Sequence, residues 1–67
     1  MTRFPEILKD LRKEKNMSRQ ELADIILVNV RTISYWELGQ RECNLDQLIQ
    51  LSKVFCVTTD YLLGLEV

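Results

Sequence analysis

The chain has 67 residues, of which 46% are apolar and 28% charged, and its formal net charge is −1. This length allows only one domain, which covers residues 1–67. The composition is ordinary for a soluble globular protein. No apolar run approaches the ~20 residues of a membrane span, and the first residues, MTRFPEILKD, contain no apolar signal region, so we expect no membrane partner and a cytoplasmic location.

Two helices are predicted before residue 27. The first covers about residues 5–15, where an apolar stripe recurs at helical spacing: Phe4, Ile7, Leu8 and Leu11. Pro5 suits the first helical position, and Asn16 can adopt the left-handed conformation that often follows a helix end. The second helix, about residues 18–26, begins at a capping box formed by Ser18 and Glu21.

Three more helices are predicted after it, and no strand pattern competes with them. The third covers about residues 29–38, from the cap Asn29 to Gly39. Asn44, with Gln47 three residues later, caps the fourth, and its predicted inner face consists of Leu45, Leu48, Ile49, Ser52 and Phe55. Thr58 caps a short fifth helix that ends at Gly64. The expected fold class is therefore all-α.

The segment from residue 17 to residue 37, MSRQELADIILVNVRTISYWE, has the pattern of two short helices joined by a tight turn. On the second of them, Ile33 and Trp36 point to one side. Another face carries residues at positions i, i+3, i+4 and i+7, which are Arg31, Ser34, Tyr35 and Leu38. A guanidinium, a hydroxyl, a phenol and nearby methyl groups can read base edges in the major groove, so this face predicts a contact with double-stranded DNA.

The charge balance argues against nucleic acid at first, because the sequence pI is about 5.3 and DNA-binding domains often exceed pI ~9. Its distribution weakens this objection. Residues 1–41 carry a net charge of +2, whereas residues 42–67 carry −3. The positive charge thus lies in the half that contains the helix-turn-helix pattern, although the phosphate affinity of a lone protomer is expected to be modest.

The sequence shows no set of residues typical of catalysis or metal binding, since its Asp and Glu residues are scattered. There is no histidine and no Gly-rich phosphate loop, and two sulfurs, Cys43 and Cys56, cannot complete a four-ligand zinc site. Without a secretion signal, reduced thiols are favoured over a disulfide. We therefore expect no enzyme activity, no metal or cofactor and no small-molecule ligand.

The run from LKDLRKEKN to DYLLG resembles the phage-repressor and Cro-type helix-turn-helix family, also called lambda-repressor-like, over residues 4–64. The specific motifs are S-x-x-E-L-A from Ser18 to Ala23, T-I-S-x-W-E-x-G from Thr32 to Gly39, and D-Y-L-L-G from Asp60 to Gly64. The resemblance implies a compact five-helix domain with the helix-turn-helix at helices two and three. It also implies binding to an operator in double-stranded DNA, usually as a dimer, in the role of a transcriptional regulator, most simply a repressor.

The resemblance also assigns roles to individual residues. The positions that usually read bases are those of Asn29, Val30, Arg31, Ser34 and Tyr35. Phosphate contacts map onto Arg19, where the family often has Gln, and onto Gln40 and Arg41 in the loop after helix three. Arg12 and Glu37 match a pair that the family uses as a structural clamp. Simpler interpretations stay open: Asn29 is explained by capping, Val30 can be a core residue, and Tyr35 can be a half-exposed packing residue.

Some positions depart from the family pattern. Leu27 stands at the corner of the helix-turn-helix, where the family normally has a glycine with positive φ, and Cys56 stands where another glycine often ends helix four. A left-handed Leu costs roughly 1 kcal/mol or more relative to Gly, or else the turn differs. Cys43 replaces a common Pro, and Gln40 replaces a common Lys.

Apolar residues near the C-terminus, Tyr61, Leu65 and Val67, predict a two-fold homodimer contact through the last helix and the tail. Ile25 and Leu27 are apolar where polar residues or Gly are expected. Together with the acidic pI, they allow an alternative function, that of an antitoxin or an adaptor that uses the same fold to bind a protein partner.

Overall fold

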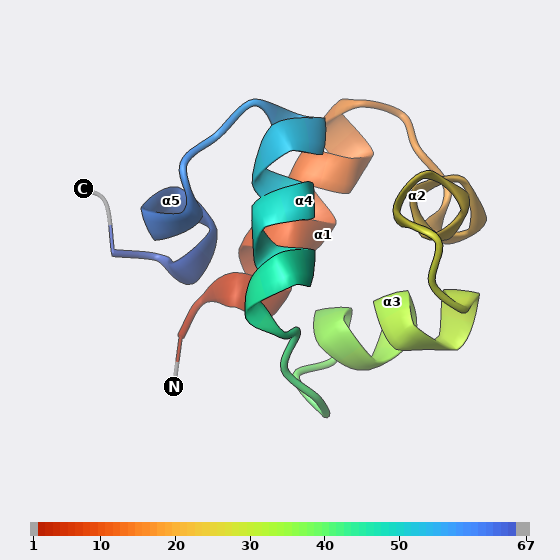
Figure 1. Cartoon of the computed structure of the whole chain (residues 1–67), viewed down its shortest axis with the longest axis horizontal. Helices are drawn as coiled ribbons and strands as arrows, with labels where there is room; N and C mark the ends of the chain where they lie inside the picture. Colours follow the sequence, from red (N-terminus) through yellow and green to blue (C-terminus); the bar gives the residue numbers. More distant parts are fainter. Residues whose placement is uncertain (1, 66–67) are drawn as a thin grey trace.

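The computed structural model describes residues 2–65, which form five helices and no strand (Figure 1). They are α1 (Phe4–Glu14), α2 (Arg19–Ile26), α3 (Val30–Glu37), α4 (Leu45–Phe55) and α5 (Thr59–Leu63). The all-α expectation is confirmed, and the expected bounds differ from the observed ones by a single residue at most helix ends. No helix in this part of the chain is both long and apolar enough to traverse a bilayer.

The helix starts follow from local capping, as predicted. Ser18 Oγ accepts a hydrogen bond from the Glu21 backbone N–H at 3.0 Å, and the Glu21 carboxylate accepts one from the Ser18 N–H at 2.9 Å. Asn44 and Gln47 form the same reciprocal box at α4. Asn29 and Thr58 each accept one backbone N–H at the starts of α3 and α5. These bonds satisfy first-turn donors that a helix cannot satisfy itself.

The helix ends explain how the chain turns without glycine at two corners. Leu27 ends α2 with φ 58° and ψ 47°, and Cys56 ends α4 with φ 55° and ψ 43°. The left-handed conformation that the family pattern requires is therefore kept, at a cost of roughly 1 kcal/mol for each side chain. Asn16 also has positive φ, as expected for its position after α1. The turn between α2 and α3 thus has the repressor-like geometry.

One apolar core joins all five helices. Its fully buried side chains come from every helix: Leu8, Leu22, Ile33, Trp36, Leu51 and Leu62. Phe4 meets Trp36 edge to face, with ring centroids 6.4 Å apart, and so fixes α1 against α3. In Figure 1, α2 and α3 lie on one side of the molecule and α5 on the other, with α1 and α4 between them.

The predicted inner face of α4 was wrong at three positions. Leu45 is 78% exposed and Ile49 46% exposed, and Ser52 is only half-buried. Leu51 is fully buried instead, with Leu48 and Phe55. Both stripes have helical spacing, so periodicity alone cannot choose between them. The choice depends on α2 and α5, which pack against α4.

Candidate nucleic-acid interface

The burial of one face of α3 orients its opposite face toward solvent. Ile33 and Trp36 are 0% and 1% exposed and anchor α3 against its neighbours. Contacts with α1 and α2 hold the helix along the edge of the molecule, at the lower right of Figure 1. The opposite face, which begins at Arg31, therefore points away from the core, as the sequence predicted.

The residues expected to read bases lie on or beside this face, with different degrees of exposure. Arg31 and Asn29 are exposed, whereas Ser34 and Tyr35 are half-buried. Asn29 Oδ1 accepts the Arg31 backbone N–H at 2.8 Å, so its capping role is present. Val30 is half-buried and packs against the core. Its structural interpretation is therefore supported, and Arg31 and Asn29 are the exposed members of the five.

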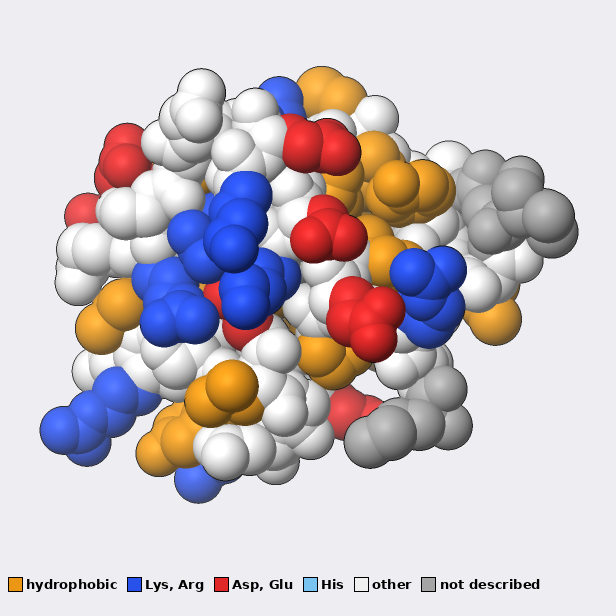
Figure 2. All heavy atoms as spheres, turned by 180° about the vertical axis from the view of Figure 1, so that it is seen from behind, with side chains coloured by type: hydrophobic (Ala, Val, Ile, Leu, Met, Phe, Trp, Pro, Cys, Tyr) orange, Lys and Arg blue, Asp and Glu red, His pale blue; other side chains and the backbone are white. Residues whose placement is uncertain are grey.

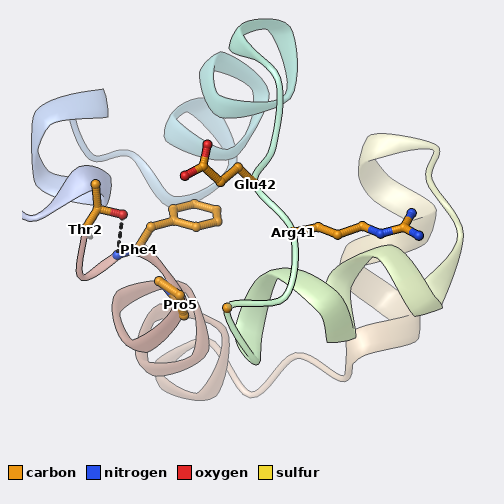
Figure 3. A pocket seen from close by; sticks show the side chains of 6 residues that line it. Thr2, Phe4, Pro5, Arg41 and Glu42 are labelled. Atoms are coloured by element: carbon orange, nitrogen blue, oxygen red, sulfur yellow. Dashed lines mark hydrogen bonds between the residues drawn. The ribbon is translucent and has the colours of Figure 1, made fainter.

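Tyr35 and Arg41, which the sequence suggested for separate roles, form one unit. The Arg41 guanidinium carbon lies 4.6 Å from the centroid of the Tyr35 ring, in the geometry of a cation–π contact. Figure 3 shows Arg41 extending from the loop after α3, away from the pocket drawn there. Sequence reasoning missed this pairing because the two residues belong to different segments, and only the turn at Gly39, with φ 73°, brings them together.

In the loop after α3, only some hydrogen-bond donors are free to contact DNA. Gln40 and Arg41 are both exposed. The Gln40 backbone N–H donates to the Tyr35 carbonyl at 2.9 Å and so closes the end of α3. A phosphate contact by Gln40 would therefore use its side-chain amide, because its backbone donor is already engaged.

Glu37 is the centre of an ionic cluster that joins three helices. Arg12 Nε donates to Glu37 Oε2 at 2.6 Å, and Arg12 Nη2 donates to Oε1 at 3.1 Å. Arg12 Nη1 also donates to the Met17 carbonyl at 2.8 Å. The predicted clamp between Arg12 and Glu37 is therefore confirmed. It is bidentate, and the Arg12 and Glu37 side chains are only 11% and 1% exposed.

Arg19 joins this cluster, which sequence reasoning did not foresee. Its Nε donates to Glu37 Oε1 at 3.2 Å, and its side chain is 42% exposed. Burial raises the pKa of Glu37, but hydrogen bonds and charges from Arg12 and Arg19 outweigh it, so the pKa lies below its ordinary value of 4.5. The carboxylate is thus ionised at neutral pH. Two guanidinium groups surround it, which gives the cluster a net charge of about +1.

The surface charge around these elements is uneven. On the face shown in Figure 2, several Lys and Arg side chains form one group, and Asp and Glu side chains lie beside it. A concentrated positive area suits a phosphate backbone better than the net charge of −1 suggests.

The hollow nearest to α3 is small. It has a volume of about 70 Å³, and its lining comes from the start of α1 and the loop after α3: Thr2, Phe4, Pro5, Gly39, Arg41 and Glu42 (Figure 3). Small-molecule sites usually measure about 300–1,000 Å³. Within residues 2–65, no three His, Cys, Asp or Glu side chains converge as metal ligands. Cys43 and Cys56 are unpaired thiols.

Known proteins are similar to this chain in sequence and in fold. The HTH-type transcriptional activator BcrR of Enterococcus faecalis is 41% identical over 61 residues, which cover 91% of this chain and 30% of that protein. A transcriptional regulator from Listeria innocua superimposes with a TM-score of 0.91 at 30% identity, over 96% of this chain and 60% of that one. The DNA-binding domain of the P22 C2 repressor superimposes with a TM-score of 0.84 at 31% identity, over 91% of this chain and 80% of that one.

These likenesses confirm the repressor-like fold that the sequence motifs implied. The chain spans between 30% and 56% of the length of the curated relatives that it matches. The match to the family described as Helix-turn-helix extends over residues 8–62, from α1 into α5, and the chain belongs to that family.

Proposed function

We propose that this chain is a DNA-binding transcriptional regulator, most simply a repressor, that reads an operator with α3 in the major groove. The observation that carries the proposal is the exposure of Arg31 in the first turn of a helix whose other face is locked into the core. Helix-turn-helix proteins read base edges with this part of their second helix. The names of the matched relatives support this function and do not favour an antitoxin or adaptor.

Arg31 is the proposed main base reader, because a guanidinium can donate two parallel hydrogen bonds to O6 and N7 of guanine. Val30 offers methyl groups to a thymine methyl, within the limits of its half-buried position. Asn29, Ser34 and Tyr35 contribute polar groups at the edges of the same face. Arg31 should therefore determine preference at one base position, and the others should adjust it.

The proposed phosphate contacts come from both sides of α3. Arg19 precedes it at the start of α2, and Gln40 and Arg41 follow it in the loop. Such contacts fix the register of a protein on DNA without reading sequence. We further propose that the protein acts by binding alone, without a catalytic step, and that it is located in the cytoplasm with the DNA.

A homodimer is proposed because one protomer has few cations for phosphate contact. Tyr61 is 44% exposed and Leu65 67% exposed, and both lie in or after α5. Val67, the third residue expected at this contact, lies outside the described residues. A symmetric dimer through α5 and the tail would present two α3 helices to half-sites about 34 Å apart.

Selection of bound fragments from random duplex DNA tests this function. We expect an enriched palindromic site with a guanine in each half-site. Arg31→Ala should lose about 1–3 kcal/mol of preference at one position and bind random DNA almost as before. If no sequence is enriched, or if Arg31→Ala weakens selected and random DNA equally, the proposal is wrong.

A further inference from the structure

We propose that Glu37 is a positioning residue for DNA, because it fixes the guanidinium of Arg19 in the orientation that grips a phosphate. The inference rests on the proposed function and deepens it. It assigns to Glu37 a role beyond the clamp with Arg12. In this role Glu37 fixes the orientation of the Arg19 side chain, which would otherwise be a mobile charge at the surface.

The first step is the rigidity of the Glu37 carboxylate. Its side chain is 1% exposed, and both oxygens accept hydrogen bonds from Arg12, at 2.6 Å and 3.1 Å. Arg12 is held in turn by the Met17 carbonyl. A carboxylate bound in this way has one orientation, so a group that bonds to it inherits that orientation.

The second step is the way Arg19 uses its donors. Arginine has five N–H donors in a planar fork, and Arg19 engages Glu37 through Nε alone. In the part of the chain that the structure describes, the Arg19 side chain forms no other hydrogen bond. Its four Nη hydrogens remain available, and the side chain as a whole is 42% exposed. The bond through Nε fixes the plane of the fork and leaves its outer edge for a bidentate acceptor.

The third step is electrostatic. Glu37 neutralises one of the two arginines, and Arg12 and Glu37 are almost completely buried. The surplus positive charge therefore emerges at Arg19, the only member of the cluster with substantial exposure. A planar, bidentate and positively charged group matches a phosphate diester oxygen pair.

The alternative is that Arg19 contributes only its charge. Lysine at position 19 separates the two possibilities, because an ammonium carries the same charge but lacks the fork that Glu37 aligns. Glutamine removes the charge. A matched control exists in Arg3, another arginine that pairs with a carboxylate, Glu6, but with both side chains at least 70% exposed and on the α5 side of the molecule.

The experiment measures binding of the full chain to a random-sequence duplex over a range of salt concentrations, for the wild type and for Arg19→Lys, Arg19→Gln and Arg3→Lys. We expect Arg19→Lys to bind about fivefold more weakly at an unchanged salt slope, as one lost charge-assisted hydrogen bond would cause. Arg19→Gln should also reduce the slope by about 0.9 per bound protomer. Arg3→Lys should match the wild type.

The outcomes distinguish this inference from the proposed function. If the wild type does not bind duplex DNA even at low salt, the proposed function fails. If the wild type binds and Arg19→Lys binds equally well, DNA binding stands and the positioning role of Glu37 is wrong.

A readout without DNA tests the same contact. In an NMR spectrum of the free wild type, the Nε–H proton of Arg19 should exchange with water more slowly than that of Arg3. In folded Glu37→Gln it should exchange faster, because the carboxylate that accepts its hydrogen bond is gone. Equal exchange rates for Arg19 and Arg3 would contradict the proposal.

Discussion

At the α2–α3 end of the molecule, a capping box starts α2 and a left-handed Leu27 ends it; at the α4–α5 end, a capping box starts α4 and a left-handed Cys56 ends it. The two ends thus share their local backbone chemistry. Their surfaces differ. Both ends expose apolar side chains, which are Ile25, Leu27 and Leu38 at the first and Leu45, Ile49, Tyr61 and Leu65 at the second. Within residues 2–65, the first end also holds a buried ionic cluster with a partly exposed arginine at its surface.

This difference indicates that helix capping specifies where the helices lie and that the outward residues specify what each end can bind. Net charge follows the same division, with +2 over residues 1–41 and −3 over residues 42–67. We therefore expect the α2–α3 end to contact DNA and, at the other end, α5 and the tail to contact a second copy of the chain. The predictions below separate the two ends.

The largest expected effect is at the ionic cluster. Glu37→Ala leaves the buried charge of Arg12 without a carboxylate and should destabilise the fold by about 3–5 kcal/mol. The double replacement Arg12→Met with Glu37→Leu removes both charges and should cost much less. Urea unfolding followed by circular dichroism measures both. If the single and double variants lose equal stability, the pair contributes only through packing.

The next effect concerns the α4–α5 end. Leu65→Glu puts a charge into the proposed dimer contact and should weaken binding to a palindromic site by about 100-fold, because the two half-sites no longer act together. The monomer should keep its stability, since Leu65 is 67% exposed. Leu45→Glu, at a leucine that is 78% exposed on α4, is the matched control. Light scattering and gel-shift titration measure both variants, and equal losses would exclude a contact confined to α5 and the tail.

A smaller effect compares the two glycine-free corners. Leu27→Gly and Cys56→Gly should each stabilise the fold by about 0.5–1 kcal/mol, because glycine adopts positive φ without a Cβ clash. Leu38→Gly is the control, since Leu38 is an exposed leucine at a helix end with φ −91°, where glycine brings no relief. Thermal unfolding should show a higher Tm for Leu27→Gly and Cys56→Gly but not for Leu38→Gly. If either of the first two variants has a lower Tm than the wild type, the left-handed residue at that corner is not strained.

The smallest effect is a pH dependence that belongs to the α2–α3 end. The pKa of Glu37 is lowered from 4.5 in the folded protein, so the unfolded chain takes up the proton first. Its contribution to stability is complete above about pH 4.5 and is lost as the pH falls through the folded pKa. The stability difference between the wild type and Glu37→Gln should therefore shrink in urea unfolding below that pH. A constant difference would exclude a lowered pKa for Glu37 in the folded protein.

The parts of the fold that could be predicted are those specified locally. The caps Ser18, Asn29, Asn44 and Thr58 act within one helical turn, so their sequence signals were sufficient. The family pattern also pointed to positive φ at Leu27, which no propensity would suggest. The inner face of α4 was mispredicted because two apolar stripes share one period, and only the neighbouring helices select Leu51 over Leu45.

The candidate site was predictable as a set of residues and not as a set of contacts. The exposure of Arg31 follows from the helical period and the burial of Ile33. The approach of Arg19 to Glu37 spans 18 positions of sequence, and the stacking of Arg41 on Tyr35 depends on the path of the loop. Neither leaves a periodic or motif-like signal, because each results from tertiary packing.

The most direct test of the central claim is an NMR titration of the isotopically labelled chain with the duplex that selection enriches. The largest backbone shift changes should fall at Arg19, across residues 29–35 and at Gln40 and Arg41, and the Arg31 side-chain signal should move with them. If the largest changes instead fall on the apolar face from Leu45 to Leu65 while those residues stay unchanged, α3 does not read DNA and the account is contradicted.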